Sequence, residues 1–191
     1  MQLVFATNNP HKLEEVQALI NTDIELKSLN DIGCFDDIPE TGATFQENAG
    51  QKSRYVFERY KLNCFGDDSG LEVETLNNEP GVYSARYSGS RDPEKNLQLV
   101  LDKLGNTGSR KARFRTVISL LLNGKEYLFE GAVEGAITTE RSGIKGFGYD
   151  PIFKPEGYDQ TFAEITAAQK NAVSHRAKAL EKMMLFLKSK T

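Results

Sequence analysis

The order of hydrophobic and polar residues predicts a strand, a loop and a helix at the start of the chain. Residues 3–6 form an apolar run that predicts a short buried strand, and residues 24–29 predict a second strand. Asn9 suits a helix cap and Pro10 suits the first helical position. Three apolar residues at helical spacing mark the inward face of this helix: Leu13, Val16 and Ile20.

Two further helices are predicted before residue 105. Residues 44–47 have the spacing of a capping box and predict a helix that runs to about residue 60. The Asp-Pro pair at residues 92–93 predicts the start of another helix, which ends near residue 105. Between these helices, residues 71–74 alternate like a half-exposed strand.

The rest of the chain predicts a hairpin and a last helix. Residues 115–122 and 127–137 read as two long strands, and Asn123-Gly124 between them favours a tight hairpin turn. Residues 173–188 predict a helix with one apolar stripe: Ala177, Leu180, Met184 and Leu187. A hairpin beside strand–helix units indicates an α/β fold with a mixed sheet, in one domain over residues 1–191.

Composition narrows the class of protein. The 191 residues suffice for a core that buries roughly 70% of the unfolded surface without disulfides or a structural metal. Cys34 and Cys64 lack C-x-x-C spacing, and with two histidines in the chain we expect neither a zinc site nor a disulfide framework. Unpaired cysteines and the lack of a basic, apolar leader at the N-terminus fit a cytoplasmic location.

Charge and hydropathy exclude two classes of partner. No apolar stretch approaches the roughly 18 residues that a membrane span needs, so we expect no membrane partner. The net charge of −3, with Lys and Arg scattered, argues against binding a nucleic-acid polymer. A small anion held with a divalent cation suits this composition better.

The first candidate site is the loop and helix start formed by Thr7, Asn8, Asn9, Pro10, His11 and Lys12. The N–H groups and the dipole of a helix start attract anions, and Lys12 adds a point charge for a phosphate. An ordinary capped helix with a surface lysine has the same pattern, so both interpretations stay open. The Gly124-Lys125 pair lacks the upstream glycine of a Walker loop, which excludes the P-loop class.

The second candidate is the acidic segment at residues 66–70, which we interpret as a turn at a strand end. Asp67 and Asp68 repel each other and resist burial, while the flanking glycines allow a ligand to approach closely. One or two carboxylates with water and phosphate oxygens are the usual ligands of Mg²⁺. A solvated turn between strands is the alternative, and we favour the magnesium interpretation because α/β ligand sites open at strand ends.

Two aromatic segments are ambiguous on their own. Phe147 lies between Gly146 and Gly148, which suits a ring that stacks on a flat base, worth roughly 1–3 kcal/mol. A core phenylalanine in a tight turn explains this pattern equally well. Residues 80–87 carry two tyrosines and an arginine, and either a pocket or a packed loop fits them.

The last candidate is the start of the final helix. Ser174 suits its cap, which puts His175 and Arg176 at the end where the helix dipole disfavours cations. That placement, with Lys170 nearby in sequence, indicates a bound anion or polar ligand. A structural histidine is the alternative.

In chain order these segments resemble the inosine triphosphate pyrophosphatase family. The matching segments cover nearly the whole chain: residues 7–9 with Lys12, residues 40–42 with Phe45 and residues 47–49, residues 67–71, residues 80–87, residues 147–153 and residues 174–176. Six segments in order are far more specific than any one of them. Gly66 departs from the pattern, where Ala is expected, and we expect it to loosen the strand end.

The resemblance implies a fold, an activity and a set of site residues. It implies an elongated mixed sheet flanked by helices, two lobes with a substrate cleft between them, and a homodimer. It implies hydrolysis of ITP, dITP and XTP to the monophosphate and pyrophosphate. Glu40 and Asp68 would bind Mg²⁺, Asp68 would accept the proton, and Asp67 would support them. The implied substrate contacts are Thr7, Asn8, Asn9, Pro10, His11, Lys12, Lys52, Ser69, Phe147, Gly148, Tyr149, Asp150, Lys170, His175 and Arg176.

Two other functions stay open. One is a pyrophosphatase of similar architecture that acts on a pyrimidine or modified nucleotide, against which the matches at Phe147 and at residues 174–176 argue. The other is a nucleotide-binding module without catalysis, which would not need Glu40, Asp67 and Asp68 together.

Overall fold

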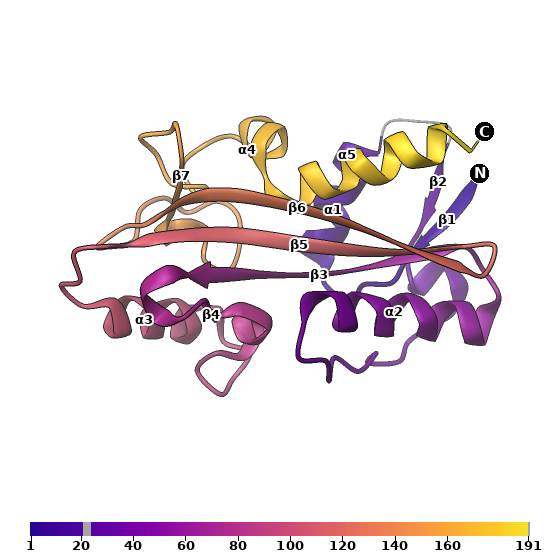
Figure 1. The fold of residues 1–191 in the computed structure, drawn as a ribbon, viewed down its shortest axis with the longest axis horizontal. Helices are drawn as coiled ribbons and strands as arrows, with labels where there is room; N and C mark the ends of the chain where they lie inside the picture. The colour runs from indigo at the N-terminus through magenta and orange to yellow at the C-terminus, as the bar shows by residue number, and fades with distance from the viewer. Residues whose placement is uncertain (21–23, 191) are drawn as a thin grey trace. The chain divides into compact units, whose positions relative to one another are not determined.

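The computed structural model describes residues 1–20 and 24–190, and their strands form one mixed sheet (Figure 1). The strand order is β2-β1-β3-β5-β6-β7, with β4 paired to β3 beside this path. β1 pairs in parallel with β2 and β3, whereas β3–β4 and β6–β7 are antiparallel. The strands are β1 (Gln2–Phe5), β2 (Glu25–Lys27), β3 (Cys64–Val73), β4 (Glu79–Pro80), β5 (Lys111–Leu122), β6 (Lys125–Ile137) and β7 (Phe153–Pro155).

The predicted helix starts are confirmed, because local capping residues set them. Asn9 caps α1, Thr44 and Glu47 form a complete capping box at α2, and Asp92 caps α3. The helices are α1 (Pro10–Leu19), α2 (Phe45–Tyr60), α3 (Pro93–Leu104), α4 (Ala167–Val173) and α5 (His175–Lys188). Among the helices of the described ranges, none is both long enough and apolar enough to cross a membrane.

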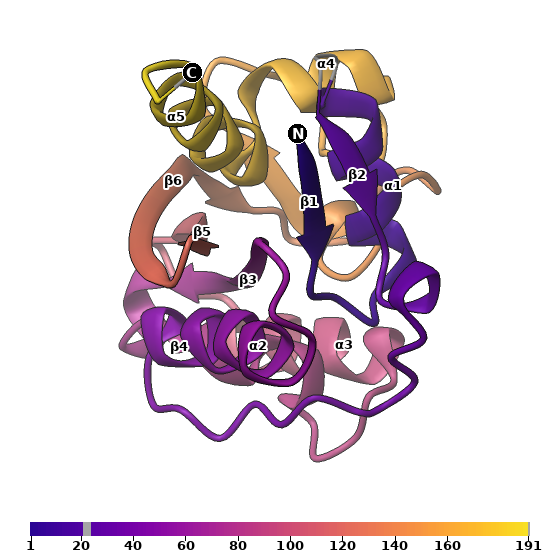
Figure 2. The ribbon, with the colours of Figure 1, turned by 90° about the vertical axis from the view of Figure 1, so that its right-hand side faces the viewer.

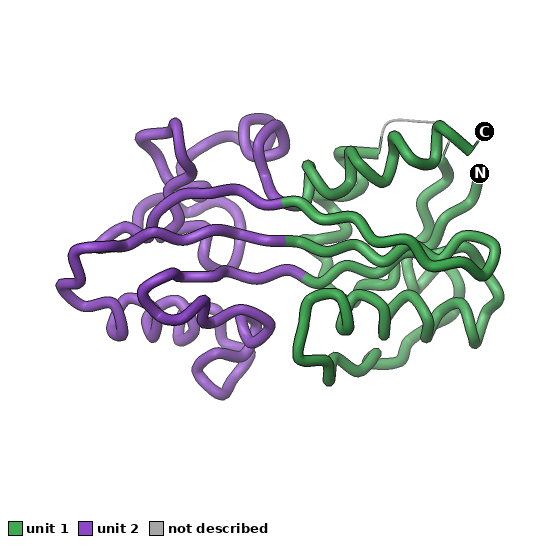
Figure 3. Tube along the Cα trace, in the orientation of Figure 1, with its two compact units in different colours: residues 1–68, 116–131, 176–191 green, residues 69–115, 132–175 purple. Residues whose placement is uncertain are grey.

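Contacts divide the chain into two compact units (Figure 3). Unit 1 comprises Met1–Asp68, Thr116–Gly131 and Arg176–Thr191, and unit 2 comprises Ser69–Arg115 and Ala132–His175. Strands β3, β5 and β6 contribute residues to both units. The single domain over residues 1–191 and the substrate cleft between two lobes stay predictions.

Unit 1 has helices on both faces of its strands, and Figure 2 shows α2 and α5 on opposite sides. Side chains alternate along β1, so Leu3 and Phe5 pack with α1 and α5, while Val4 packs with α2. The ring of Phe5 stacks on Phe65 of β3, with centroids 4.5 Å apart. Both faces of the strands are therefore buried, as expected for a sheet that includes parallel pairs.

Unit 2 has a core of its own. Leu97, Val100 and Leu104 of α3 pack with buried residues from β3, β5 and β6. Phe114 of β5 lies at the centre of an aromatic cluster, 4.7 Å from the Phe153 ring and 6.1 Å from the Phe162 ring. The hairpin predicted at Asn123-Gly124, which belongs to unit 1, is confirmed, since both residues have the positive φ that such a turn needs.

The acidic turn predicted at residues 66–70 is wrong, because these residues lie inside the continuous strand β3. Residues 71–73 are buried rather than half-exposed. Gly66 does not loosen this strand: a Cβ there would lie 2.6 Å from the backbone oxygen of Ala49, so glycine lets α2 approach β3 closely.

The last predicted helix is divided and its stripe is confirmed in part. The chain forms α4, turns at Ser174 with extended backbone, and continues as α5. The buried residues of the α5 stripe are Ala179, Leu180, Met183 and Leu187, and Met184 packs against the same cluster, so Leu180, Met184 and Leu187 are confirmed, whereas Ala177 is only half-buried. The second predicted strand is also shorter than residues 24–29, since β2 spans Glu25–Lys27.

Candidate active site

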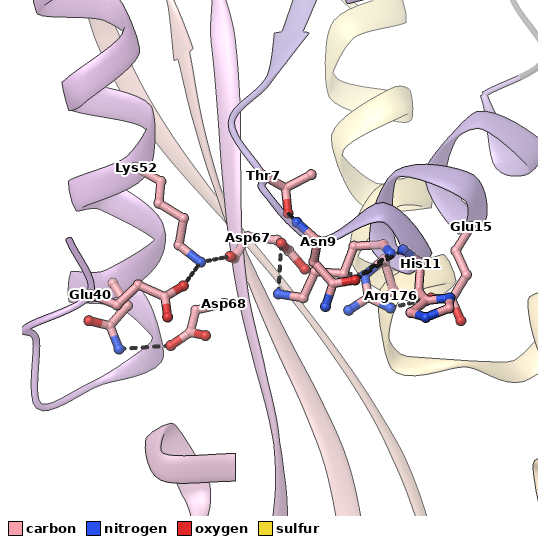
Figure 4. A network of polar contacts seen from close by, with 11 residues as sticks. Thr7, Asn9, His11, Glu15, Glu40, Lys52, Asp67, Asp68 and Arg176 are labelled. Carbon is pink, nitrogen blue, oxygen red and sulfur yellow. Dashed lines mark hydrogen bonds and ion pairs between the residues drawn. The ribbon is translucent and has the colours of Figure 1, made fainter. Parts of the chain in front are cut away.

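Strand β3 directs the two neighbouring aspartates to opposite sides of the sheet (Figure 4). On one side Asp68 lies near Glu40 and Lys52, and on the other the Asp67 carboxylate faces Arg176. The strand therefore gives the two acids separate environments, whereas a shared turn would have placed both on one cation.

Asp67 pairs with two cations, of which Lys12 is partly buried and Arg176 is buried. Its Oδ1 accepts from Lys12 Nζ at 3.0 Å and its Oδ2 accepts from Arg176 Nε at 3.2 Å, and Arg176 also pairs with Glu15. Asp67 is 1% exposed and Arg176 2%. Burial alone would raise the pKa of Asp67, but the charges of Lys12, Arg176 and Lys52 hold it well below its usual range.

Asp68 has the opposite electrostatic balance. Its side chain is 6% exposed, and its Oδ2 accepts from Asn48 Nδ2 at 2.9 Å. Burial raises the pKa of this carboxyl, and the charges of Lys52 and Lys12 offset only part of that effect. A buried carboxyl with a raised pKa is suited to accept a proton.

Lys52 links the backbone of β3 to Glu40. Its Nζ donates to the backbone oxygen of Asp67 at 2.7 Å and forms an ion pair with Glu40. Burial opposes its charge, but the carboxylates of Glu40, Asp67 and Asp68 raise the pKa of Lys52 above its usual value. Burial would raise the pKa of Glu40, and the Lys52 charge lowers it below its usual range. At neutral pH both residues therefore carry charge.

The loop before α1 differs in detail from the predicted anion site. Asn9 Oδ1 accepts from the N–H groups of His11 and Lys12, at 3.0 and 3.3 Å, so the cap itself holds two helix-start donors. Asn9 N–H donates to Thr7 Oγ1, and Asn8 Nδ2 donates to the backbone oxygen of Asp36. Lys12 is paired with buried Asp67, so the alternative of a surface lysine is wrong.

Arg176 does not need a bound anion to compensate its position at the start of α5. Glu15 and Asp67 pair with its guanidinium, from positions 161 and 109 residues away in the sequence. The local dipole argument for a ligand at this arginine is therefore wrong, because protein carboxylates supply the compensation. Contact between Arg176 and a substrate stays a prediction.

In unit 2, one carboxylate holds the segment around Phe147. Asp150 Oδ2 accepts from the Phe147 N–H at 2.9 Å and from Lys170 Nζ at 2.7 Å. The same Nζ lies 4.9 Å from the centroid of the Phe147 ring, which is half-buried rather than part of the core. Gly146 has φ +74° and no room for a Cβ beside Asp150, so glycine is required there.

The remaining predicted contacts in unit 2 vary in burial. The buried ring of His175 stacks on Phe114, with centroids 4.8 Å apart and planes 13° apart. Tyr149 is buried and its hydroxyl donates to the backbone oxygen of Ser84 at 2.7 Å. Gly148 and Ser69 are partly exposed. Stacking on Phe114 shows that His175 has a structural role, whatever else it does.

Three residues that organise these contacts were not among the predicted site residues, although Asn48 and Ser84 lie in segments that match the family. Asn48 bonds Asp68, Glu15 bonds Arg176, and Ser84 Oγ accepts from the Leu71 N–H and donates to the backbone oxygen of Gly81. Ser84 shows that residues 80–87 pack against the end of β3, which supports the packed-loop interpretation. For Asn48, the available signal was its position four residues before Lys52, which places both side chains on one face of α2.

The carboxylates present fit a hard cation such as Mg²⁺. Glu40 and Asp68 lie on the same side of β3 (Figure 4), and Mg²⁺ commonly takes only one or two protein carboxylates, with water and phosphate oxygens as its other ligands. Within the described ranges, no cluster of three or more His, Cys, Asp or Glu side chains is arranged for a metal. Asp67 faces the other side of β3 and pairs with Lys12 and Arg176, so the candidate ligands stay Glu40 and Asp68, which the family resemblance implies.

The fold is a mixed sheet flanked by helices, and its candidate site places two neighbouring acids of β3 beside cations. These features define an α/β protein with a charged site on the central strand β3. A model of the Ham1 family matches residues 3–186, and the chain belongs to this family. The family resemblance of the six sequence segments is thereby confirmed.

Named relatives and solved structures agree with this assignment. The chain is 49% identical to a dITP/XTP pyrophosphatase of Flavobacterium johnsoniae over 96% of both chains. It is 50% identical to one of Christiangramia forsetii, over 98% of this chain and 99% of that one. The Ham1 protein of Staphylococcus aureus superposes with a TM-score of 0.91 at 38% identity over 100% of both chains, which confirms the predicted fold class.

Proposed function

We propose that this protein hydrolyses the non-standard purine nucleoside triphosphates ITP, dITP and XTP to monophosphates and pyrophosphate, and so removes them from the nucleotide pool. The names of relatives about half identical over nearly the whole chain support this substrate class. The single observation that carries the chemistry is the placement of the buried Asp68 carboxylate, bonded to Asn48, on the side of β3 that also holds Glu40 and Lys52.

In the proposed reaction, water attacks the α-phosphorus in line and pyrophosphate leaves. Asp68 accepts the proton of that water, for which a carboxyl with a raised pKa is suited. The bond from Asn48 orients the Asp68 carboxylate before substrate binds. The proton acceptor is therefore already placed by the protein.

Glu40 and Asp68 would hold Mg²⁺, which when bound lowers the pKa of coordinated water and neutralises phosphate charge. Lys52 pairs with Glu40 in the protein alone, so its ammonium is positioned to turn toward an arriving phosphate. Lys12 supplies a second, partly buried cation for the charge that develops on the leaving pyrophosphate. Asp67 holds Lys12 and Arg176 in place and takes no part in proton transfer.

We assign recognition of the base to residues of unit 2 and the start of α5. Phe147 offers a half-buried ring for stacking, and Asp150 with Lys170 holds its backbone and ring. Hypoxanthine and xanthine carry a keto oxygen at position 6, where adenine carries an amino group. Donors from His175 or Arg176 would pair with the keto oxygen and face a donor in adenine, which costs about 1–3 kcal/mol.

A substrate panel tests the proposal. We expect pyrophosphate release from ITP, dITP and XTP in the presence of Mg²⁺, at kcat/KM values at least about tenfold above that for ATP. Chelation of the divalent cation should abolish release.

Release mainly from thymidine triphosphate would favour the pyrimidine nucleotide alternative. Binding of ITP without any release would favour a nucleotide-binding module. GTP keeps the keto oxygen and adds a 2-amino group. Its kcat/KM relative to that of ITP therefore measures how strongly the site rejects the 2-amino group.

We further propose that the protein is a cytoplasmic homodimer. It binds its nucleoside triphosphate substrate and has neither a nucleic-acid polymer nor a membrane as partner. The dimer rests on the family resemblance, and the absence of polymer binding on the net charge of −3. Sedimentation of the purified chain measures whether it is a dimer. A binding assay with duplex DNA at physiological salt measures whether it binds a nucleic-acid polymer.

A further inference from the structure

The carboxamide of Asn48 contacts two separate parts of the candidate site. Its Nδ2 donates to Asp68 Oδ2 at 2.9 Å, and its Oδ1 accepts from the backbone N–H of Gly42 at 2.7 Å. Asn48 is 1% exposed, so water does not compete for either bond. One side chain therefore joins Asp68 to the loop that follows Glu40.

The loop at residues 41–44 is fixed to α2 by side chains of that helix. Its four consecutive N–H groups all donate to α2, the first to Gln51 Oε1, the second to Asn48 Oδ1 and the last two to Glu47 Oε2. Among the described residues, Asn48 is the one of these three side chains that also bonds Asp68. Asn48 thus contributes to holding both the loop and the acid.

Packing at Gly42 supports this contact independently. A Cβ at residue 42 would lie 2.8 Å from Asn48 Oδ1 and 2.5 Å from the Cβ of Glu47. Any other residue would push the loop away from α2 and lengthen the bond to Asn48. The chain therefore has the residue that the close approach requires.

Helix geometry relates Asn48 to Lys52. The two residues are four positions apart, so both project from the same face of α2 toward β3. Lys52 pairs with Glu40 and bonds the backbone of Asp67, while Asn48 bonds the side chain of Asp68. Successive turns of one helix thus hold Glu40 and Asp68.

We propose that Asn48 is a positioning residue that fixes the orientation of the Asp68 carboxylate and its spacing from Glu40. This inference rests on the proposed function, in which Asp68 both binds a cation and accepts a proton. Those two tasks need the two carboxylate oxygens to differ, and rotation about the Cβ–Cγ bond would exchange them. The bond from Asn48 to Oδ2 opposes that rotation.

Asn48→Asp separates the two contacts of this side chain. The new carboxylate still accepts from the Gly42 N–H, but in place of a donor it sets a second negative charge against Asp68. We expect kcat for ITP to fall by about 10- to 100-fold while KM stays within about threefold, because orientation is lost and binding is kept. Gln51→Glu is the matched control, since it makes the same amide-to-carboxylate change at the neighbouring loop contact, where Gln51 Oε1 accepts from the Thr41 N–H, and its kcat should stay near that of the wild type.

A double-mutant cycle tests whether Asn48 acts through Asp68. In the Asp68→Asn background, adding Asn48→Asp should lower turnover by less than about threefold. In the double variant the amide introduced at position 68 can donate to the carboxylate introduced at position 48, so donor and acceptor are exchanged across the same contact. Its thermal midpoint without substrate should therefore be higher than that of Asn48→Asp alone. A purely structural role would give no such dependence of turnover on Asp68.

The outcomes separate this inference from the proposed function. No pyrophosphate release by the wild-type chain would overturn the proposed function. Release by the wild type, with Asn48→Asp turning over as fast as Gln51→Glu, would overturn the role of Asn48 alone. A loss in the Asp68→Asn background as large as that in the wild type would also overturn it.

Discussion

Asp68→Asn should lower kcat for ITP by about 10³-fold and leave the protein as stable to heat as the wild type, or more stable. The substitution removes the proton acceptor and one negative charge from the cation site. The raised pKa of Asp68 means that its ionised form is disfavoured in the folded state, so a neutral side chain relieves that cost at neutral pH. Steady-state kinetics at saturating Mg²⁺ and a thermal unfolding curve measure the two effects.

Asp102→Asn is the control for this substitution. Asp102 is exposed on α3 and accepts from Gln98, so the same change there should leave kcat within about twofold. If Asp68→Asn kept kcat within tenfold of the wild type, Asp68 would not be the proton acceptor.

Asp67→Asn, one residue away on the same strand, should instead destabilise the fold by about 3–5 kcal/mol. The change leaves partly buried Lys12 and buried Arg176 without the carboxylate that pairs with both of them. Urea unfolding at neutral pH measures this loss. Glu126→Gln removes a carboxylate from the exposed pair with Arg54 and should cost about 0–1 kcal/mol.

The pH dependence of the free energy of unfolding gives a second test of the role of Asp67. Because the pKa of Asp67 is lower in the folded chain than in the unfolded one, its contribution is present above the unfolded value of about 4 and is lost as pH falls below it. The stability of Asp67→Asn should therefore fall less steeply than that of the wild type below about pH 4. Equal slopes, or an Asp67→Asn variant as stable as Glu126→Gln, would contradict the anchoring role.

The elements that were predicted correctly depend on contacts close in sequence. Asn9, Thr44 and Asp92 each bond N–H groups two or three residues later, so the pattern near each residue was enough to predict the helix start. The hairpin at Asn123-Gly124 depends on two consecutive positive φ angles, which its sequence favours. The physical cause of these elements therefore lies in contacts between residues close in sequence, which a local pattern contains.

The acidic segment was mispredicted because its stabilising partners are distant in sequence. A glycine-flanked pair of aspartates is typical of a solvated turn, and only tertiary contacts make it tolerable in a buried strand. Lys12 is 55 residues from Asp67 and Arg176 is 109 residues from it, while Asn48 is 20 residues from Asp68. Six matching segments still indicated the family, because order and spacing carry information that no single local pattern contains.

The central claim is that water attacks the α-phosphorus, and hydrolysis of ITP in ¹⁸O-enriched water tests it most directly. Phosphorus NMR or mass spectrometry of the products locates the label after one turnover. The proposed mechanism predicts one ¹⁸O atom in the monophosphate and none in the pyrophosphate. Label in the pyrophosphate, or release of inorganic phosphate in its place, would contradict it.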